Sequence, residues 1–180
     1  MRASASGARE AGFAARAATV VDAAELGRIH VQIWRDTYRG LMSDTVLDEL
    51  DPVDRGERWA QIIASRLLPR GAHEPALTRV AVAPSGELVG FASVGASRDD
   101  DPPTEVELWA LNVVAAQHGT GVADLLVEET LGDRAASLWV AEGNGRAIAY
   151  YRRLGFEPDG TTRPDPGLGV RELRMVRVSA

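Results

Sequence analysis

Residues 104–156 constrain the fold more than any other part of the chain. A strand-like run at 104–117 leads into a loop of small residues at 118–123, which is followed by a helix-like run. A short apolar run with the sequence SLWVAE, at 137–142, and a second helical segment at 144–154 come next. This order of strand, helix, strand and helix predicts helices packed on a layered sheet, with the two strands as parallel neighbours.

The composition fits a globular domain and argues against several classes of site. The chain has 180 residues, of which 45% are hydrophobic, and a formal net charge of -6. That charge argues against binding of nucleic acid or of an anionic membrane surface, because both need a basic face. The absence of cysteine excludes disulfides, a thiolate nucleophile and a cysteine-based metal site. We therefore expect no metal.

The ends of the chain and its apolar runs bear on domain organisation. No apolar run approaches the ~20 residues that span a bilayer, and residues 1–15 lack the apolar core of a signal peptide. We therefore expect a cytoplasmic protein without a membrane segment. We expect residues 1–15 to form a disordered tail and residues 16–180 to form a single domain.

Hydrophobic periodicity and turn residues predict the remaining elements. The predicted helices cover 22–40, a short stretch after Ser43, and a segment from Pro52 to Leu67. The predicted strands cover 17–21, 77–83, 87–95, 156–162 and 170–178. Together with the central segment, they indicate a mixed sheet in an α/β or α+β architecture.

The alternation of apolar residues changes phase within the strand at 104–117. Val106, Leu108 and Ala110 are apolar at first, and then Leu111 and Val113 take over. A strand changes phase only by gaining a residue, which a β-bulge supplies. The bulge would bend this strand away from the next one and expose backbone groups that an extended ligand with amides can pair with. The alternative is a regular strand in which Trp109 is a partly buried, outward-facing residue.

The loop after this strand has the features of an anion site. Gly119 and Gly121 allow close approach of the backbone, and the dipole of the helix that begins near Gly121 favours negative charge there. A P-loop is excluded because no Gly-Lys-Ser/Thr triplet follows, and a dinucleotide fingerprint is disfavoured because Asp124 takes the place of its third small residue. An ordinary tight turn remains the alternative.

Two motifs, in this order and in fitting strand and helix contexts, resemble the GNAT superfamily of acyl-CoA-dependent N-acyltransferases. The family's coenzyme loop reads Gln/Arg-x-x-Gly-x-Gly/Ala, and residues 118–123 read His-Gly-Thr-Gly-Val-Ala. Its later motif reads Asn-x-x-Ala-x-x-Phe-Tyr-x-x-x-Gly-Phe, and residues 144–156 read Asn-Gly-Arg-Ala-Ile-Ala-Tyr-Tyr-Arg-Arg-Leu-Gly-Phe. His118 replaces the usual Gln or Arg, and Ala115 stands where Pro is common, so we expect altered affinity but not lost binding.

The resemblance covers nearly everything after residue 16 and implies both a fold and an activity. The fold is a GNAT-type mixed, mostly antiparallel central sheet of six to seven strands, with helices on both faces and a bulged fourth strand splayed from the fifth. The activity is acetyl-CoA-dependent N-acetyl transfer, in which a primary amine attacks the thioester directly. The implied acetyl-CoA-binding residues are Leu111, Asn112, Val113, His118, Gly119, Thr120, Gly121, Val122, Ala123, Asn144, Ala147 and Tyr151.

The resemblance also assigns catalytic and acceptor roles. The backbone N–H of Val113 matches the donor to the thioester oxygen, Glu107 matches the carboxylate that removes the amine's proton, and Tyr151 matches the donor to the leaving thiolate. Glu105, on the same face as Glu107, is the alternative base. Trp34 and Tyr38 match the acceptor pocket. The alternatives are a solvent-facing Glu107, a Tyr151 in the core, and plain packing roles for the two first-helix aromatics.

Two other functions remain as alternatives. One is a catalytically idle acyl-CoA-binding sensor or assembly module, and the other is a plain nucleotide-binding domain, which the failed nucleotide motifs disfavour. The identity of the acceptor amine, the preferred acyl chain and the oligomeric state stay open, although dimers are common in the family. We expect acetyl-CoA and an amine as partners, and neither nucleic acid nor a membrane.

Overall fold

The computed structural model describes residues 4–65, 76–165 and 169–178. Within these ranges, a seven-stranded sheet forms the centre of the molecule, in the order β1-β2-β3-β4-β5-β7-β6. Only β4 and β5 pair in parallel, and the other neighbours pair antiparallel. The strands are β1 (Ala14–Ala17), β2 (Leu77–Val82), β3 (Leu88–Ala96), β4 (Val106–Val113), β5 (Ala136–Ala141), β6 (Glu157–Asp165) and β7 (Val170–Arg177). The predicted GNAT-type sheet is confirmed.

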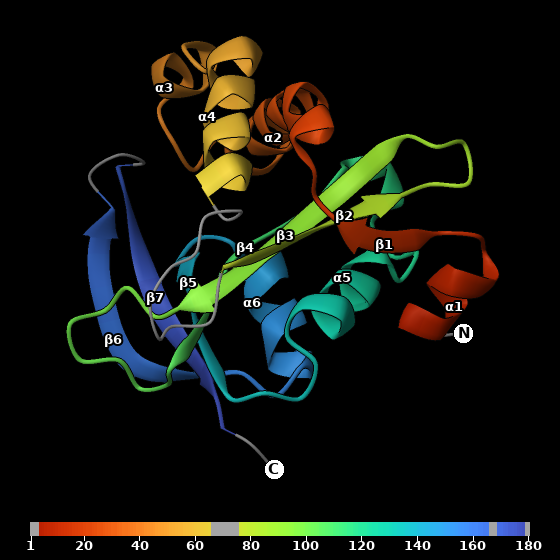
Figure 1. Cartoon of the computed structure of the whole chain (residues 1–180). Helices are drawn as coiled ribbons and strands as arrows, with labels where there is room; N and C mark the ends of the chain where they lie inside the picture. Colours follow the sequence, from red (N-terminus) through yellow and green to blue (C-terminus); the bar gives the residue numbers. More distant parts are fainter. Residues whose placement is uncertain (1–3, 66–75, 166–168, 179–180) are drawn as a thin grey trace.

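Helices cover both faces of the sheet (Figure 1). One face carries α2 (Ala23–Tyr38), α3 (Asp44–Asp48) and α4 (Pro52–Ser65), and the other carries α5 (Val122–Thr130) and α6 (Gly145–Arg153). A short helix, α1 (Ala5–Glu10), lies beside α5, and 3-10 turns occupy Val20–Asp22 and Ala115–Gln117. None of the helices in the described ranges combines the length and apolar character that crossing a bilayer requires.

The helix pair α2 and α4 is fixed by a close backbone crossing. A Cβ atom on Gly27 of α2 would lie 2.3 Å from the carbonyl oxygen of Pro52 and 2.5 Å from the amide nitrogen of Gly56 in α4. Only glycine permits this approach, because any side chain there would collide with backbone. The crossing sets the direction of α2, whose C-terminal end carries Trp34 and Tyr38 toward the sheet.

The opposite face has a core that joins α5, α6 and the β5–β7 strands. Tyr151 of α6 packs with Leu138, Phe156 and Met175, which are all buried. Val122 and Leu126 of α5 pack against buried residues of β2, β3 and β4. These two clusters hold the N-terminal ends of α5 and α6 against the sheet on either side of the β4–β5 junction.

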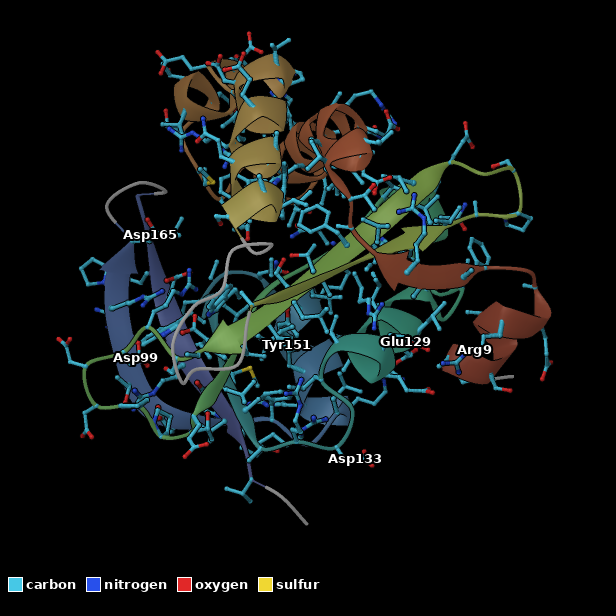
Figure 2. All side chains as sticks on the ribbon, in the orientation of Figure 1. Arg9, Asp99, Glu129, Asp133, Tyr151 and Asp165 are labelled. Atoms are coloured by element: carbon cyan, nitrogen blue, oxygen red, sulfur yellow. The ribbon has the colours of Figure 1, made fainter. Side chains whose placement is uncertain are left out.

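The N-terminal segment differs from the predicted tail. Residues 1–3 lie outside the described residues, but residues 4–15 contain α1 and the beginning of β1, and the first strand is Ala14–Ala17 where 17–21 was predicted. Ala5 and Ala8 are buried against Leu125, and Arg9 pairs with Glu128 and Glu129 of α5, each at 2.9 Å (Figure 2). The tail prediction was wrong here because small alanine side chains pack closely without a long apolar run.

Candidate active site

The strands β4 and β5 diverge immediately after they meet. Their single registered pair joins Glu107 to Ser137. On the other edge of β4, the pairing with β3 steps from Ser93–Ala110 to Val94–Leu108, which leaves Trp109 as an extra residue. The predicted bulge is therefore confirmed, and it lies at Trp109.

The backbone of β4 beyond the bulge faces the gap between β4 and β5. The Val114 amide donates to the Val89 carbonyl oxygen of β3 at 2.9 Å. Since backbone groups of successive strand residues point to opposite sides, the N–H and C=O groups of Val113, and likewise of Leu111, point away from β3. The Val113 carbonyl oxygen lies 3.0 Å from Nε2 of His118, which agrees with this direction. The gap therefore presents strand edges that an extended ligand with amide groups can pair with.

A cleft of about 610 Å³ occupies this gap and continues to both faces of the sheet. Its walls come from α2, β4, the loop after β4, β5, α6, β6 and β7. The predicted site residues that line it are Trp34, Tyr38, Leu111, Asn112, Val113, His118, Gly119, Gly121, Ala123, Asn144, Ala147 and Tyr151. Most of the predicted coenzyme residues are thus brought together by the fold.

The loop 118–121 has the conformation that a phosphate site requires. Gly119 and Gly121 have φ values of 81° and 89°, a left-handed region that favours glycine. The helix α5 starts directly afterwards, so its first-turn amides have no partner within the helix. These amides and the helix dipole favour an anion at this end of the cleft.

Two loop residues from the predicted set do not line the cleft with their side chains. The Val122 side chain is fully buried in the α5 core, and the Thr120 hydroxyl donates to the Gln117 carbonyl oxygen at 2.8 Å. The Thr120 amide also donates to the Gln117 carbonyl oxygen, at 3.4 Å, so of these two residues it is the Val122 amide that remains for a ligand. Gly121 meets a second constraint, because a Cβ atom there would lie 2.1 Å from the Ser4 carbonyl oxygen of the segment before α1.

His118 links the loop to α6 and to β4. Its Nδ1 lies 2.7 Å from Nη1 of Arg146, which can only donate, so Nδ1 accepts and Nε2 carries the proton. Nε2 then donates to the Val113 carbonyl oxygen. The imidazole therefore acts as a bridge whose two nitrogens have opposite roles, and Arg146 is fixed at the cleft.

Tyr151 lies at the centre of the molecule (Figure 2). It is buried on α6, edge-on to the rings of Phe156 and Tyr150, and it lines the cleft. Burial, and after it the charge of Tyr38, raises the pKa of the Tyr151 phenol. The hydroxyl is therefore protonated at neutral pH and can donate a hydrogen bond or a proton.

The α6 helix starts with Asn144, whose Oδ1 accepts from the Ala147 amide at 3.1 Å. This is the N-cap role that its position at a helix start favours. Elsewhere on α6, the Tyr150 hydroxyl donates to the Asp124 carboxylate at 3.4 Å, and the Arg153 guanidinium lies over the Tyr150 ring. Asn144 thus has a structural role whether or not it also contacts a ligand.

The comparison with known proteins decides the family. Residues 32–156, more than half of the chain, match the sequence model of the acetyltransferase (GNAT) family. The chain belongs to this family. The activity of the family therefore applies to it at the level of acetyl transfer, and GNAT enzymes use acetyl-CoA as their acetyl donor.

Two bacterial proteins show the relationship at low identity. The probable N-acetyltransferase Rv2775 of Mycobacterium tuberculosis is 24% identical over 161 residues, which cover 86% of this chain and 87% of that protein. The uncharacterized N-acetyltransferase YuaI of Bacillus subtilis is 26% identical over 175 residues, which cover 90% and 95%. The match spans nearly the full length in both cases.

Solved structures share the fold. The PaiA N-acetyltransferase of Thermoplasma acidophilum, solved in complex with coenzyme A, gives a TM-score of 0.71 at 18% identity and covers 93% of this chain and 99% of that one. An N-acetyltransferase of Kribbella flavida gives 0.64 at 23% identity, with coverage of 94% and 99%. At such identities these structures support the GNAT fold alone.

The predicted base of this GNAT enzyme lies outside the cleft. Among the described residues, neither Glu107 nor Glu105 is part of the cleft wall. Glu107 is 1% exposed, and its carboxylate accepts hydrogen bonds from the amide, Nε and Nη2 of Arg98. Glu105 is exposed to solvent. Arg98 itself is part of the cleft wall, as are Leu108 and Trp109, which follow Glu107 in β4.

The wall of the cleft opposite α5 contains residues that the sequence did not single out. Besides Arg98, it includes Trp139 of β5, Arg163 and Asp165 of β6, and Glu172 of β7. Trp34 and Tyr38 of α2 lie near this part, with their rings edge-on at 5.6 Å. No three or more histidines, aspartates or glutamates among the described residues are grouped as a metal site. We call this part of the cleft the acceptor side, because Trp34 and Tyr38 are the residues predicted to contact the acceptor.

Proposed function

We propose that this GNAT enzyme transfers the acetyl group of acetyl-CoA to the nitrogen of a primary amine. The observation that carries the proposal is the outward direction of the Leu111 and Val113 backbone in the gap between β4 and β5. The pantetheine arm of the coenzyme is extended and carries two amide groups, so it can pair with β4 as an added strand. The loop 118–121 then receives the diphosphate at the α5 terminus.

The chemical step needs few protein groups. The lone pair of the amine forms the new C–N bond at the thioester carbon, and the negative charge that develops on the oxygen is stabilised by the Val113 N–H. The C–S bond breaks, and the thiolate takes a proton from the buried Tyr151 hydroxyl in this proposal. The bonded nitrogen loses its extra proton as the amide forms, and that proton restores the tyrosine through solvent. The amine attacks without its proton, whose removal at pH 7 costs roughly 4.6 kcal/mol for an alkyl amine.

The amine also needs a proton acceptor. Glu107 as that base stays a prediction, and its action would require Arg98 to release the carboxylate. This ion pair is also the one observation that favours the second candidate, a GNAT domain that binds acetyl-CoA without turnover. The two candidates agree on coenzyme binding and differ only in the release of free coenzyme A.

Two measurements test the proposal in sequence. Thermal unfolding is followed with acetyl-CoA, ATP or NAD, and acetyl-CoA at ~100 times its dissociation constant is expected to add about 2.7 kcal/mol of stability. A shift with ATP or NAD alone would overturn the coenzyme assignment. Release of free thiol is then measured with acetyl-CoA and a panel of primary amines. Release above the amine-free rate supports transfer, and binding without release for every amine supports the idle domain.

A further inference from the structure

Glu172 lies on the acceptor side of the cleft, on the face of the sheet that α2 covers. It is opposite Ala141 of β5 and Arg163 of β6 in the strand register. The next residue, Leu173, packs with the core cluster of Tyr151 on the other face. Because strand residues alternate between faces, Glu172 points to the α2 side. Its side chain lines the cleft although it is only 12% exposed.

The Glu172 carboxylate is only partly satisfied by the protein. Its Oε2 accepts from Nε of Arg163 at 2.9 Å. In the described part of the chain, Oε1 has no hydrogen-bond donor, and it is not among the fully enclosed atoms. A carboxylate can accept from several donors at both oxygens. One oxygen therefore remains for a ligand in the cleft.

The charges around Glu172 do not balance. Arg163 lies 2.9 Å from Glu172 and 3.7 Å from Asp99, and Arg174 lies 3.0 Å from Asp99 and 2.6 Å from Asp159. Two guanidinium groups thus face three carboxylates, so this network has a net charge of -1 although each carboxylate is paired. A low-dielectric site with an uncompensated negative charge favours a cationic ligand.

Two neighbouring features add to this preference. Asp165, which ends β6, also lines the cleft, and Asp99 and Asp165 both lie on the β6 side of the molecule (Figure 2). The negative charges of Glu172 and Asp165 reach the phenol of Tyr38, whose pKa is raised by burial first and by these two charges second. Tyr38 belongs to the same cleft wall, so the two carboxylates act on the space beside it.

Glu172 lies too far across the sheet to contact the reacting atoms. β5 lies between β4 and β7, and neighbouring strands in a sheet are ~4.8 Å apart, so β7 lies on the order of 10 Å or more from the Val113 amide in β4. The attacking amine must be close to Val113. Glu172 is therefore placed for a different group of the same acceptor molecule.

We infer that Glu172 binds a second positive charge on the acceptor, so that the preferred acceptors are primary amines that carry another cationic group at some distance. This inference rests on the proposed function and names the substrate class of its acceptor side. Trp34 and Trp139 line the same space and provide apolar walls for the chain that joins the two charged ends.

The test uses three primary amines that differ only at their far end, namely 1,5-diaminopentane, 1-aminopentane and 5-aminopentanoate. Their binding to the full-length protein is measured by calorimetry, with and without saturating coenzyme A. The diamine is expected to bind about tenfold or more tightly than 1-aminopentane, because one additional charge-assisted hydrogen bond raises the affinity by about that factor. The third amine, 5-aminopentanoate, is expected to bind most weakly. Equal affinity of the diamine and 1-aminopentane would overturn the inference.

Variants then assign the preference to Glu172. Glu172→Gln keeps an oxygen for Arg163 and removes the charge, so the diamine is expected to bind within about twofold of 1-aminopentane in this variant. Glu172→Asp is expected to keep part of the preference. Glu142→Gln is the matched control, since Glu142 pairs with Arg171 outside the cleft wall and its loss should leave the preference unchanged.

The outcomes separate this inference from the proposed function. A diamine preference that persists in Glu172→Gln overturns the role of Glu172 alone. Absence of coenzyme binding overturns the proposed function, while the measurements without coenzyme A still report on the charge preference. Where 1,5-diaminopentane is acetylated, the ratio of its kcat/KM to that of 1-aminopentane is expected to fall about tenfold in Glu172→Gln.

Discussion

His118 donates through Nε2 to the carbonyl oxygen of Val113, at 3.0 Å, and thereby ties the loop before α5 to the end of β4. The same ring accepts from Arg146 at 2.7 Å. The family's motif has Gln or Arg at this position, and the replacement by histidine retains a donor toward the strand. The residue that departs from the motif therefore positions two others, Val113 in the gap and Arg146 at the cleft.

The first prediction concerns this bridge. His118→Phe preserves an aromatic ring and removes both hydrogen bonds, so the dissociation constant of coenzyme A is expected to rise about tenfold, in line with the loss of one or two hydrogen bonds. His118→Gln retains a donor for Val113 and is expected to stay within a few-fold of wild type. Calorimetric titration of coenzyme A measures both, and equal affinities of the two variants would contradict the bridging role.

The second prediction tests the loop as an anion site. A Cβ atom at Gly119 would meet no heavy atom within 4 Å, although φ is 81°. Asparagine and aspartate both tolerate this backbone region better than other residues. Gly119→Asp is therefore expected to lose most coenzyme affinity and Gly119→Asn to retain much of it, because the two differ by one negative charge. Similar affinities for the pair would place the diphosphate elsewhere.

Gly121 is a poorer position for this experiment. Its Cβ atom would collide with the Ser4 carbonyl oxygen, so a variant there would change packing and charge together. Gly119 separates the two effects.

The third prediction concerns the leaving thiolate. The Tyr151 hydroxyl has no hydrogen-bond partner within the described ranges, so Tyr151→Phe should change stability by less than about 1 kcal/mol. If the hydroxyl protonates the thiolate, kcat is expected to fall about 10²-fold or more with little change in coenzyme affinity. Tyr150→Phe serves as the control, since Tyr150 contacts Asp124 instead. Steady-state thiol release measures both, and an unchanged kcat in Tyr151→Phe would remove this residue from the mechanism.

The fourth prediction concerns stability in acid. His30 is buried beside Trp34 and Phe91, and its Nδ1 accepts from Nε1 of Trp59 at 3.2 Å. Burial first, and the charge of Arg55 second, lowers the pKa of His30 to about 3. The unfolded chain, with a histidine pKa near ~6.5, binds a proton that the folded protein excludes. Stability is thus fully present above pH 6.5 and declines as the pH falls toward 3, by about 1.4 kcal/mol per unit.

The matched variant for this prediction is His30→Asn, which keeps an acceptor near Nδ1 and does not titrate. Its absolute stability is expected to be lower because it leaves a cavity, so the readout is the slope of unfolding free energy against pH between 6.5 and 4. Urea unfolding at several pH values measures that slope. Asp22, whose pKa is lowered to about 2 mainly by its hydrogen bond with Arg16, adds acid sensitivity only below about pH 4. An identical slope in the variant would exclude His30.

Local pattern was sufficient to predict much of the fold. The helix predicted at 22–40 is α2, the helix that begins at Pro52 is α4, and the phase change in the strand at 104–117 is the bulge at Trp109. These features depend on residues close together in the sequence. The α1 helix escaped prediction because its stability comes from α5, more than a hundred residues away, through Leu125 and the Arg9 ion pairs.

In the site, too, the features that depend on neighbouring residues were predicted, and those that depend on long-range contacts were not. The glycine loop and the Asn144 cap follow from neighbouring residues and from the family's motifs. The ion pair between Arg98 and Glu107 could not be predicted from the sequence, because it depends on how the loop after β3 folds back. Glu172 was missed because its direction depends on the insertion of β7 between β5 and β6, a long-range pairing that strand alternation alone does not reveal.

The contact between Ser4 and Gly121 connects the N-terminal segment to the loop 118–121. Although α1 supplies no group to the cleft wall, it braces the turn on which the diphosphate would rest. A fusion tag or a proteolytic cut ahead of β1 would therefore alter acetyl-CoA affinity from a distance. Preparations of the enzyme that differ only in their first dozen residues should not be treated as equivalent in kinetic work.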